Sequence, residues 1–107
     1  MEKEPTCACD WVELGNDLAR KGKHREAVSC CEKAIELDPT SAEAWLCKCN
    51  GLKGLGKHDE ALECYDKALK LDPKLVQAWV NKGNILFKLH REDEAMAAMD
   101  KARKARK

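Results

Sequence analysis

Three tryptophans recur in this chain at a fixed interval of 34 residues, at Trp11, Trp45 and Trp79. Other residues that keep the same spacing are Asn16, Asn50 and Asn84, Glu26, Glu60 and Glu94, Ala27, Ala61 and Ala95, Ala34, Ala68 and Ala102, and Pro5, Pro39 and Pro73. Such self-similarity is typical of proteins in which one small structural unit recurs and packs against copies of itself. No single unit can bury its apolar face alone, so the spacing predicts a stack.

The composition favours one small helical domain. Ala, Leu, Glu and Lys are abundant and β-branched residues are few, which favours helix over strand. A chain of 107 residues has little room for a buried catalytic cavity. Its formal net charge is only +1, so we expect no overall field that would attract nucleic acid or an acidic membrane.

Simple sequence signals suggest a cytoplasmic protein. No apolar run approaches the ~20 residues needed to span a bilayer. The first residues lack the basic and then apolar pattern of a secretory signal. Seven cysteines are an odd number, which argues against a closed disulfide framework, so we expect mostly free thiols in a reducing compartment.

Each 34-residue unit is predicted to form two amphipathic helices joined by a tight turn. In the second unit the first helix is expected over about residues 41–54, with Ser41 as its N-cap. Gly56 ends this helix and residues 57–59 form the turn. The second helix follows over about residues 59–71 and stops at Asp72-Pro73, because the residue before a proline is pushed out of the helical region. In the third unit His90 replaces the turn glycine.

Small side chains are expected where the two helices of a unit face each other. Large residues at these positions would keep the helix backbones apart. The pairs predicted to face each other are Gly15 with Ala27, Cys49 with Ala61, and Gly83 with Ala95.

The pattern Trp45, Gly56, Ala61, Tyr65, Ala68 and Pro73 resembles the tetratricopeptide repeat (TPR) family. The resemblance implies an all-α, right-handed solenoid of three helix-turn-helix repeats with about six helices. It also implies one domain over residues 1–107, with repeats over about 8–41, 42–75 and 76–107. The departures from the family pattern are Lys48 and Lys82 in place of leucine, Cys49 in place of glycine, and His90; we expect them only to soften local packing.

In this family the first helices of successive repeats line a groove that commonly holds a peptide. The groove positions implied here are Asn16, Arg20, Leu46, Asn50, Lys53, Val80, Asn84, Phe87 and Lys88, with Cys9, Val12, Ala19, Glu43, Gly54 and Gln77 on the same face. The asparagine ladder could pair with a peptide backbone, because a carboxamide both donates and accepts hydrogen bonds. Beside it Arg20, Lys53 and Lys88 form a positive stripe, which predicts a preference for peptides with acidic side chains or a free carboxylate. The alternative is that these are solvated polar positions inherited from duplication.

One subtype of the family clamps the C-terminal carboxylate of Hsp70 and Hsp90 chaperones with five groove residues, namely Lys, Asn, Asn, Lys and Arg. The matching positions here are Val12, Asn16, Cys47, Gln77 and Asn81. Only Asn16 fits and all three cations are missing. A chaperone cofactor of that subtype is therefore not expected.

The cysteines support an alternative function, in which the protein binds zinc or an iron–sulfur cluster or senses redox state. Stacking could bring together Cys30, Cys31, Cys47, Cys49 and Cys64. However, the chain has no C-x-x-C pair, and residues i and i+2 of a helix point about 200° apart, so one C-x-C pair should not chelate easily. We therefore favour buried packing thiols and expect no cofactor. Cys7 and Cys9 are expected to be the most reactive.

Other functions have weaker support. No histidine, serine or cysteine has a partner that would indicate catalysis, and no phosphate-binding loop is present, so we expect no enzyme. The basic tail from Lys101 onward is expected to stabilise the end of the last helix, with nucleic-acid binding as the less favoured alternative. Met96 and Met99 could leave an adaptable surface on that helix for weak self-association.

Overall fold

Residues 7–106, which the computed structural model describes, form helices and no strands. The helices are α1 (Ala8–Arg20), α2 (His24–Leu37), α3 (Ala42–Gly54), α4 (His58–Leu71), α5 (Val76–Lys88) and α6 (Glu92–Ala105). The predicted all-α repeat fold with six helices is confirmed over this range. None of these helices is long and apolar enough to cross a membrane.

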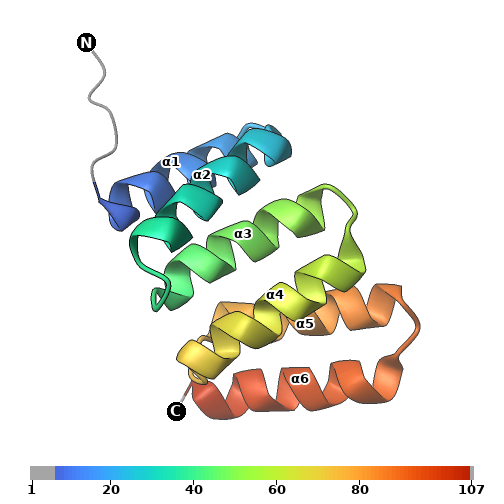
Figure 1. The fold of residues 1–107 in the computed structure, drawn as a ribbon. Helices are drawn as coiled ribbons and strands as arrows, with labels where there is room; N and C mark the ends of the chain where they lie inside the picture. Colours follow the sequence, from blue (N-terminus) through green and yellow to red (C-terminus); the bar gives the residue numbers. More distant parts are fainter. Residues whose placement is uncertain (1–6, 107) are drawn as a thin grey trace.

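The helices form three hairpins stacked in chain order, with α1 and α2 at one end and α6 at the other (Figure 1). Each helix packs against the next along the chain, and the stack measures 48 × 27 × 19 Å. The first helices of the hairpins also contact one another, α1 with α3 and α3 with α5. No such contact joins the second helices α2, α4 and α6 of the described chain. The first helices therefore lie on the inside of a curved stack.

The helix boundaries follow local hydrogen bonding. Ser41 caps α3 as predicted, because its hydroxyl oxygen accepts a hydrogen bond from the Ala44 N–H at 3.2 Å. However, α4 begins at His58, one residue earlier than expected. The Lys57 carbonyl already accepts the first helical hydrogen bond, from the Ala61 N–H at 2.9 Å. The turn is therefore completed before His58 and does not extend to Asp59.

The turns between repeats explain why tryptophan and proline recur together. The Trp45 indole N–H donates to the Pro39 carbonyl at 3.0 Å, and the Trp79 indole donates to the Pro73 carbonyl at 2.8 Å. Each tryptophan therefore ties the body of a first helix to the turn that precedes it. Trp11 belongs to the same series, but Pro5 lies outside the described residues.

The turn within each hairpin needs one residue in the left-handed region. Gly22 and Gly56 supply it with φ of 84° and 78°, and His90 supplies it with φ of 62°. In the third turn the Arg91 N–H donates to the Leu86 carbonyl at 2.8 Å, which is the hydrogen bond of a Schellman helix end. Histidine thus keeps the turn geometry, although its Cβ disfavours this conformation.

Replacing His90 with glycine should stabilise the protein. Relief of the left-handed strain is worth about 1–2 kcal/mol, and the greater freedom of glycine in the unfolded chain offsets about 0.5–1 kcal/mol of this. We expect the free energy of unfolding, measured in urea, to rise by about 0.5–1 kcal/mol. The control, Gly56→Ala, should lower it by a similar amount. A destabilised His90→Gly variant would contradict this account of the third turn.

The core is divided unequally between the two ends of the stack. The first repeat and the start of α3 share a small buried cluster of Val12, Cys31, Ala34, Ala44 and Cys47. The second and third repeats share a larger cluster that includes the fully buried Tyr65 and Ile85. The joint between α2 and α3 therefore buries fewer large side chains than the joint between α4 and α5.

A disulfide bond between Cys31 and Cys47 joins α2 to α3 at the smaller cluster. Their Cα atoms lie 5.7 Å apart, a usual separation for a disulfide. A Cβ atom on Gly15 would approach the two sulfur atoms to 2.7 and 2.8 Å and the Ala27 carbonyl oxygen to 3.3 Å, so glycine is required there. The predicted proximity of Gly15 and Ala27 is confirmed, but the expectation of unpaired thiols is wrong for Cys31 and Cys47.

Reduction of this disulfide should loosen the first repeat. A crosslink between residues 16 apart stabilises a fold by about 3 kcal/mol in the chain-entropy treatment. We expect a reductant to lower the free energy of unfolding of the oxidised protein by about 2–3 kcal/mol. The double variant Cys31→Ala/Cys47→Ala should not respond to reductant, whereas Cys30→Ser should respond like the parent. Identical urea midpoints with and without reductant would rule out this crosslink.

Candidate functional site

A hollow of about 270 Å³ opens on the inner face of the stack, between α1, α3 and the start of α5. Its lining, which we call the first-helix hollow, consists of Val12, Asn16, Glu43, Leu46, Cys47, Asn50, Leu75 and Gln77. The side-chain amides of Asn16, Asn50 and Gln77 supply its polar groups. Glu43 is its one charged residue among those described.

Three of the nine groove residues named from the sequence line this hollow, namely Asn16, Leu46 and Asn50. The other six, Arg20, Lys53, Val80, Asn84, Phe87 and Lys88, do not line it. Arg20 is paired with Asp17 on its own helix. Sequence reasoning missed Leu75, which precedes α5 and therefore falls outside the helical periodicity. It assigned Cys47 to the comparison with the chaperone clamp and to the cysteine set, but not to this groove.

Asn50 is held by a hydrogen-bond network that crosses three helices. The Tyr65 hydroxyl donates to Asn50 Oδ1 at 2.7 Å, and Asn81 Nδ2 donates to the same oxygen at 3.0 Å. Lys53 Nζ in turn donates to Asn81 Oδ1 at 3.5 Å. Because Oδ1 already accepts two hydrogen bonds, the Asn50 amide is fixed with its NH₂ group as the part that can donate.

The three asparagines of the ladder are consequently not equivalent. The residues one repeat before Tyr65 and Asn81 are Cys31 and Cys47, which form the disulfide beside Asn16. One repeat after Tyr65 stands Met99, which offers no hydrogen-bond donor. Asn50 is thus a structural residue as well as a binding candidate, and Asn84 is exposed.

The Tyr65–Asn50 hydrogen bond should contribute measurably to stability. Tyr65 is fully buried, and burial raises its pKa, so its hydroxyl stays protonated and needs an acceptor. We expect Tyr65→Phe to lower the free energy of unfolding by about 1 kcal/mol, and Asn50→Ala to lower it by about 2 kcal/mol because the hydroxyl is left unpaired. The double variant should lose less than the sum, by about 1 kcal/mol. Strict additivity in urea melts would argue against the bond.

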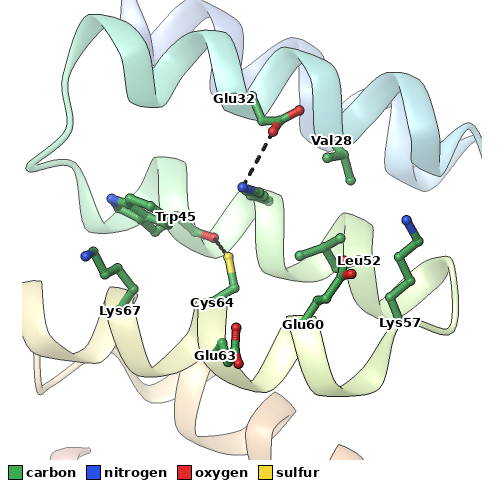
Figure 2. A pocket seen from close by; sticks show the side chains of 10 residues that line it. Val28, Glu32, Trp45, Leu52, Lys57, Glu60, Glu63, Cys64 and Lys67 are labelled. Atoms are coloured by element: carbon green, nitrogen blue, oxygen red, sulfur yellow. Dashed lines mark hydrogen bonds and ion pairs between the residues drawn. The ribbon is translucent and has the colours of Figure 1, made fainter.

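On the outer face, a groove of about 560 Å³ separates α2 from α4, with α3 as its floor (Figure 2). An ion pair crosses this groove, between Lys48 Nζ on α3 and the Glu32 carboxylate on α2, at 3.5 Å. The same nitrogen lies 5.7 Å from the centre of the Trp45 ring. Lys67 approaches the same ring at 5.7 Å. The Cys64 thiol lies against α3 and donates to the Trp45 carbonyl at 3.5 Å.

The same arrangement recurs one repeat later between α4 and α6. Lys82 Nζ lies 2.5 Å from the Asp66 carboxylate and 5.5 Å from the centre of the Trp79 ring. Lys101 covers this ring at 5.3 Å. Lys48 and Lys82, which depart from the family pattern, thus each join two repeats through an ion pair. The first lysine of the basic tail likewise has a structural position.

The cysteines do not converge on one centre as the metal alternative requires. Cys31 and Cys47 are bonded to each other, and Cys30 is a free, buried thiol. Cys49 and Cys64 form a second pair. Burial raises the pKa of the Cys49 thiol, and the hydrogen bond from Cys49 lowers the pKa of Cys64. Within residues 7–106, one group of three ligand atoms lies within 4.8 Å of one another, and it includes none of these five cysteines.

Comparison with known proteins gives consistent matches to one family. Residues 8–41 and 76–106 match family profiles described as tetratricopeptide repeat, and residues 52–89 match one described as TPR repeat. No curated protein sequence matches the chain.

Solved structures share the fold. The chain is similar to MamA, with a TM-score of 0.86 and 25% identity over 94% of this chain and 59% of that one. It is similar to the first TPR of Spaghetti (RPAP3) bound to HSP90 peptide SRMEEVD, with a TM-score of 0.87 and 23% identity over 92% and 78%. A third similar structure is YrrB, a TPR protein with an unusual peptide-binding site, with a TM-score of 0.83 and 24% identity over 94% and 52%.

The chain therefore spans little more than half the length of MamA and YrrB. The matched segments, the recurring tryptophan and alanine positions and the stacked hairpins lead to one conclusion: the chain belongs to the tetratricopeptide repeat family.

Proposed function

We propose that this protein is an interaction module that holds a peptide segment of a partner protein on its inner face, with the first-helix hollow as the centre of the site. The observation that carries the proposal is the fixed amide of Asn50. Its acceptor oxygen is occupied inside the protein, so its NH₂ group can meet a peptide carbonyl with little loss of side-chain freedom.

The composition of the hollow favours backbone recognition. The amides of Asn16 and Gln77 line the hollow together with that of Asn50, while Val12 and Leu46 supply apolar surface. Amides can pair with the carbonyl and N–H groups of an extended segment, whatever its side chains are. Small or apolar side chains of the peptide would pack on Val12 and Leu46.

Charge decides how an acidic peptide would lie. Glu43 is in the hollow and would repel a carboxylate there. Lys53, by contrast, donates a hydrogen bond to Asn81, which in turn donates to Asn50. Lys88 is exposed near the end of α5. The proposed ligand therefore places neutral residues over the hollow and an acidic residue toward Lys53 and Lys88. Arg20 contributes less, because Asp17 partly neutralises it.

Peptide binding by similar folds supports the class of function but not the same ligand. The Spaghetti structure carries an HSP90 peptide, whereas the family's clamp for a terminal carboxylate needs cations that Val12, Cys47 and Gln77 do not supply. The hollow occupies those positions without a lysine or arginine. An internal segment of the partner is thus the better candidate ligand than a free C-terminus.

The proposal can be tested with peptides selected from a random displayed library on the intact protein. We expect Asn16→Ala to weaken a selected peptide about fivefold to tenfold through loss of one hydrogen bond, at any salt concentration. We expect Lys53→Met to weaken acidic peptides about threefold to tenfold at low salt and to reduce their salt dependence. Fluorescence anisotropy with labelled peptides measures both effects.

The chain offers a matched control in its glutamates. Glu43 lines the first-helix hollow, whereas Glu60 lines the outer groove. Glu43→Gln should change the affinity of selected peptides, and Glu60→Gln should leave it unchanged. If affinity responds to Glu60→Gln and not to Asn16→Ala or Glu43→Gln, the inner face is not the binding site.

A further inference from the structure

A compact set of metal-ligating side chains lies at the start of α1, apart from the first-helix hollow. The sulfur atoms of Cys7 and Cys9 are 2.6 Å apart, and the Asp10 carboxylate lies with them inside a 4.8 Å group. Both cysteines are exposed. Elsewhere in the described part of the chain, no three ligand atoms of His, Cys, Asp or Glu come this close.

The backbone explains why the two thiols meet here. Cys7 is the N-cap of α1 and has extended dihedral angles, φ −126° and ψ 167°. Its side chain therefore does not follow the 100° step of the helix, and it turns back toward Cys9. The sequence-based argument that a C-x-C pair cannot chelate assumed that both residues are helical, and that assumption fails at Cys7.

The second C-x-C pair of the chain shows the contrast. Cys47 and Cys49 both lie inside α3. Cys47 faces the small cluster and is bonded to Cys31, whereas Cys49 belongs to the larger cluster. The same spacing thus separates two thiols within a helix and brings them together at a helix start.

We propose that Cys7, Cys9 and Asp10 bind a zinc ion, with two thiolates and one carboxylate as ligands and a fourth position open to water. Thiolate and carboxylate are both ordinary zinc ligands, and three protein ligands with one open position is a known arrangement. Tetrahedral zinc with Zn–S distances of about 2.3 Å places two sulfurs about 3.8 Å apart. Rotation of the exposed Cys7 and Cys9 side chains can open the pair from 2.6 Å to this separation.

The charge balance suits the location. Each thiol releases one proton to solvent when the ion binds, so the three ligands are two thiolates and one carboxylate. The resulting site carries one net negative charge, and it sits at the N-terminus of α1, where the helix dipole favours an anion. Because each thiol must give up its proton to the solvent before the ion can bind, binding tightens as the pH rises.

Cobalt is a direct probe of this site in the reduced, metal-free chain with Cys31→Ala/Cys47→Ala as the parent background, so that the opened disulfide adds no thiols. We expect one Co²⁺ per chain, a thiolate-to-cobalt charge-transfer absorption and displacement of cobalt by Zn²⁺. Cys7→Ser and Cys9→Ser should each weaken binding by at least about 100-fold, and Asp10→Asn by about tenfold. Serine is a good N-cap, so Cys7→Ser should keep α1 intact, which circular dichroism checks. Cys30→Ser, at a buried thiol outside the group, is the control and should bind like the parent.

The pH dependence separates this site from a single reactive thiol. Release of two protons gives an apparent affinity that rises about 100-fold per pH unit below the thiol pKa values. Asp10→Asn should lower the affinity without changing that slope. A slope of one proton, cobalt absorption that survives in the Cys7→Ser/Cys9→Ser double variant, or the absence of bound cobalt would overturn the proposal. Peptide binding is measured separately, so either proposal can fail without the other.

Discussion

The stacking of this chain depends on the seam between successive repeats. A single hairpin of two short helices has too little apolar surface to fold alone, so each must bury one side against the next. The seam is not uniform along the stack. At the first joint it contains a small cluster and a disulfide bond between α2 and α3. At the second joint the equivalent positions are Tyr65 and Asn81, which meet through Asn50.

The difference between these two joints shows that the same backbone arrangement can be held together by different side-chain interactions. Cys31 and Tyr65 occupy the same place in their repeats, as do Cys47 and Asn81. Two small thiols cannot fill the volume of a phenol ring, but a covalent bond between them holds the helices together. A tyrosine fills the volume, and its hydroxyl then needs a partner, which the side-chain oxygen Oδ1 of Asn50 provides. The disulfide holds Cys47 and the tyrosine hydrogen bond holds Asn50, and both of these residues line the first-helix hollow.

The sequence predicted what is common to the three repeats, and it failed where one repeat differs from another. The helix pairs, the Ser41 cap, the strained His90 turn and the close contact of Gly15 with Ala27 all follow from local preferences or from periodicity. The Asn50 network does not, because the three asparagines look identical in the sequence and only long-range contacts distinguish them. The pairing of Cys31 with Cys47 and the bridging by Lys48 likewise depend on distances across a joint. The convergence of Cys7 and Cys9 depends on one extended residue, which a spacing rule for helices cannot detect.

The same reasoning indicates where specificity can arise in such a stack. Residues that recur, such as the tryptophans with their proline carbonyls and covering lysines, are occupied with holding the repeats together. A change at these positions costs stability, so they carry little information about a partner. Besides the recurring asparagines, the hollow and the start of α1 contain exposed residues that vary between repeats, including Glu43, Gln77 and Cys9. Because these positions are free of the packing constraint, they are where one repeat protein can come to differ from another in what it binds.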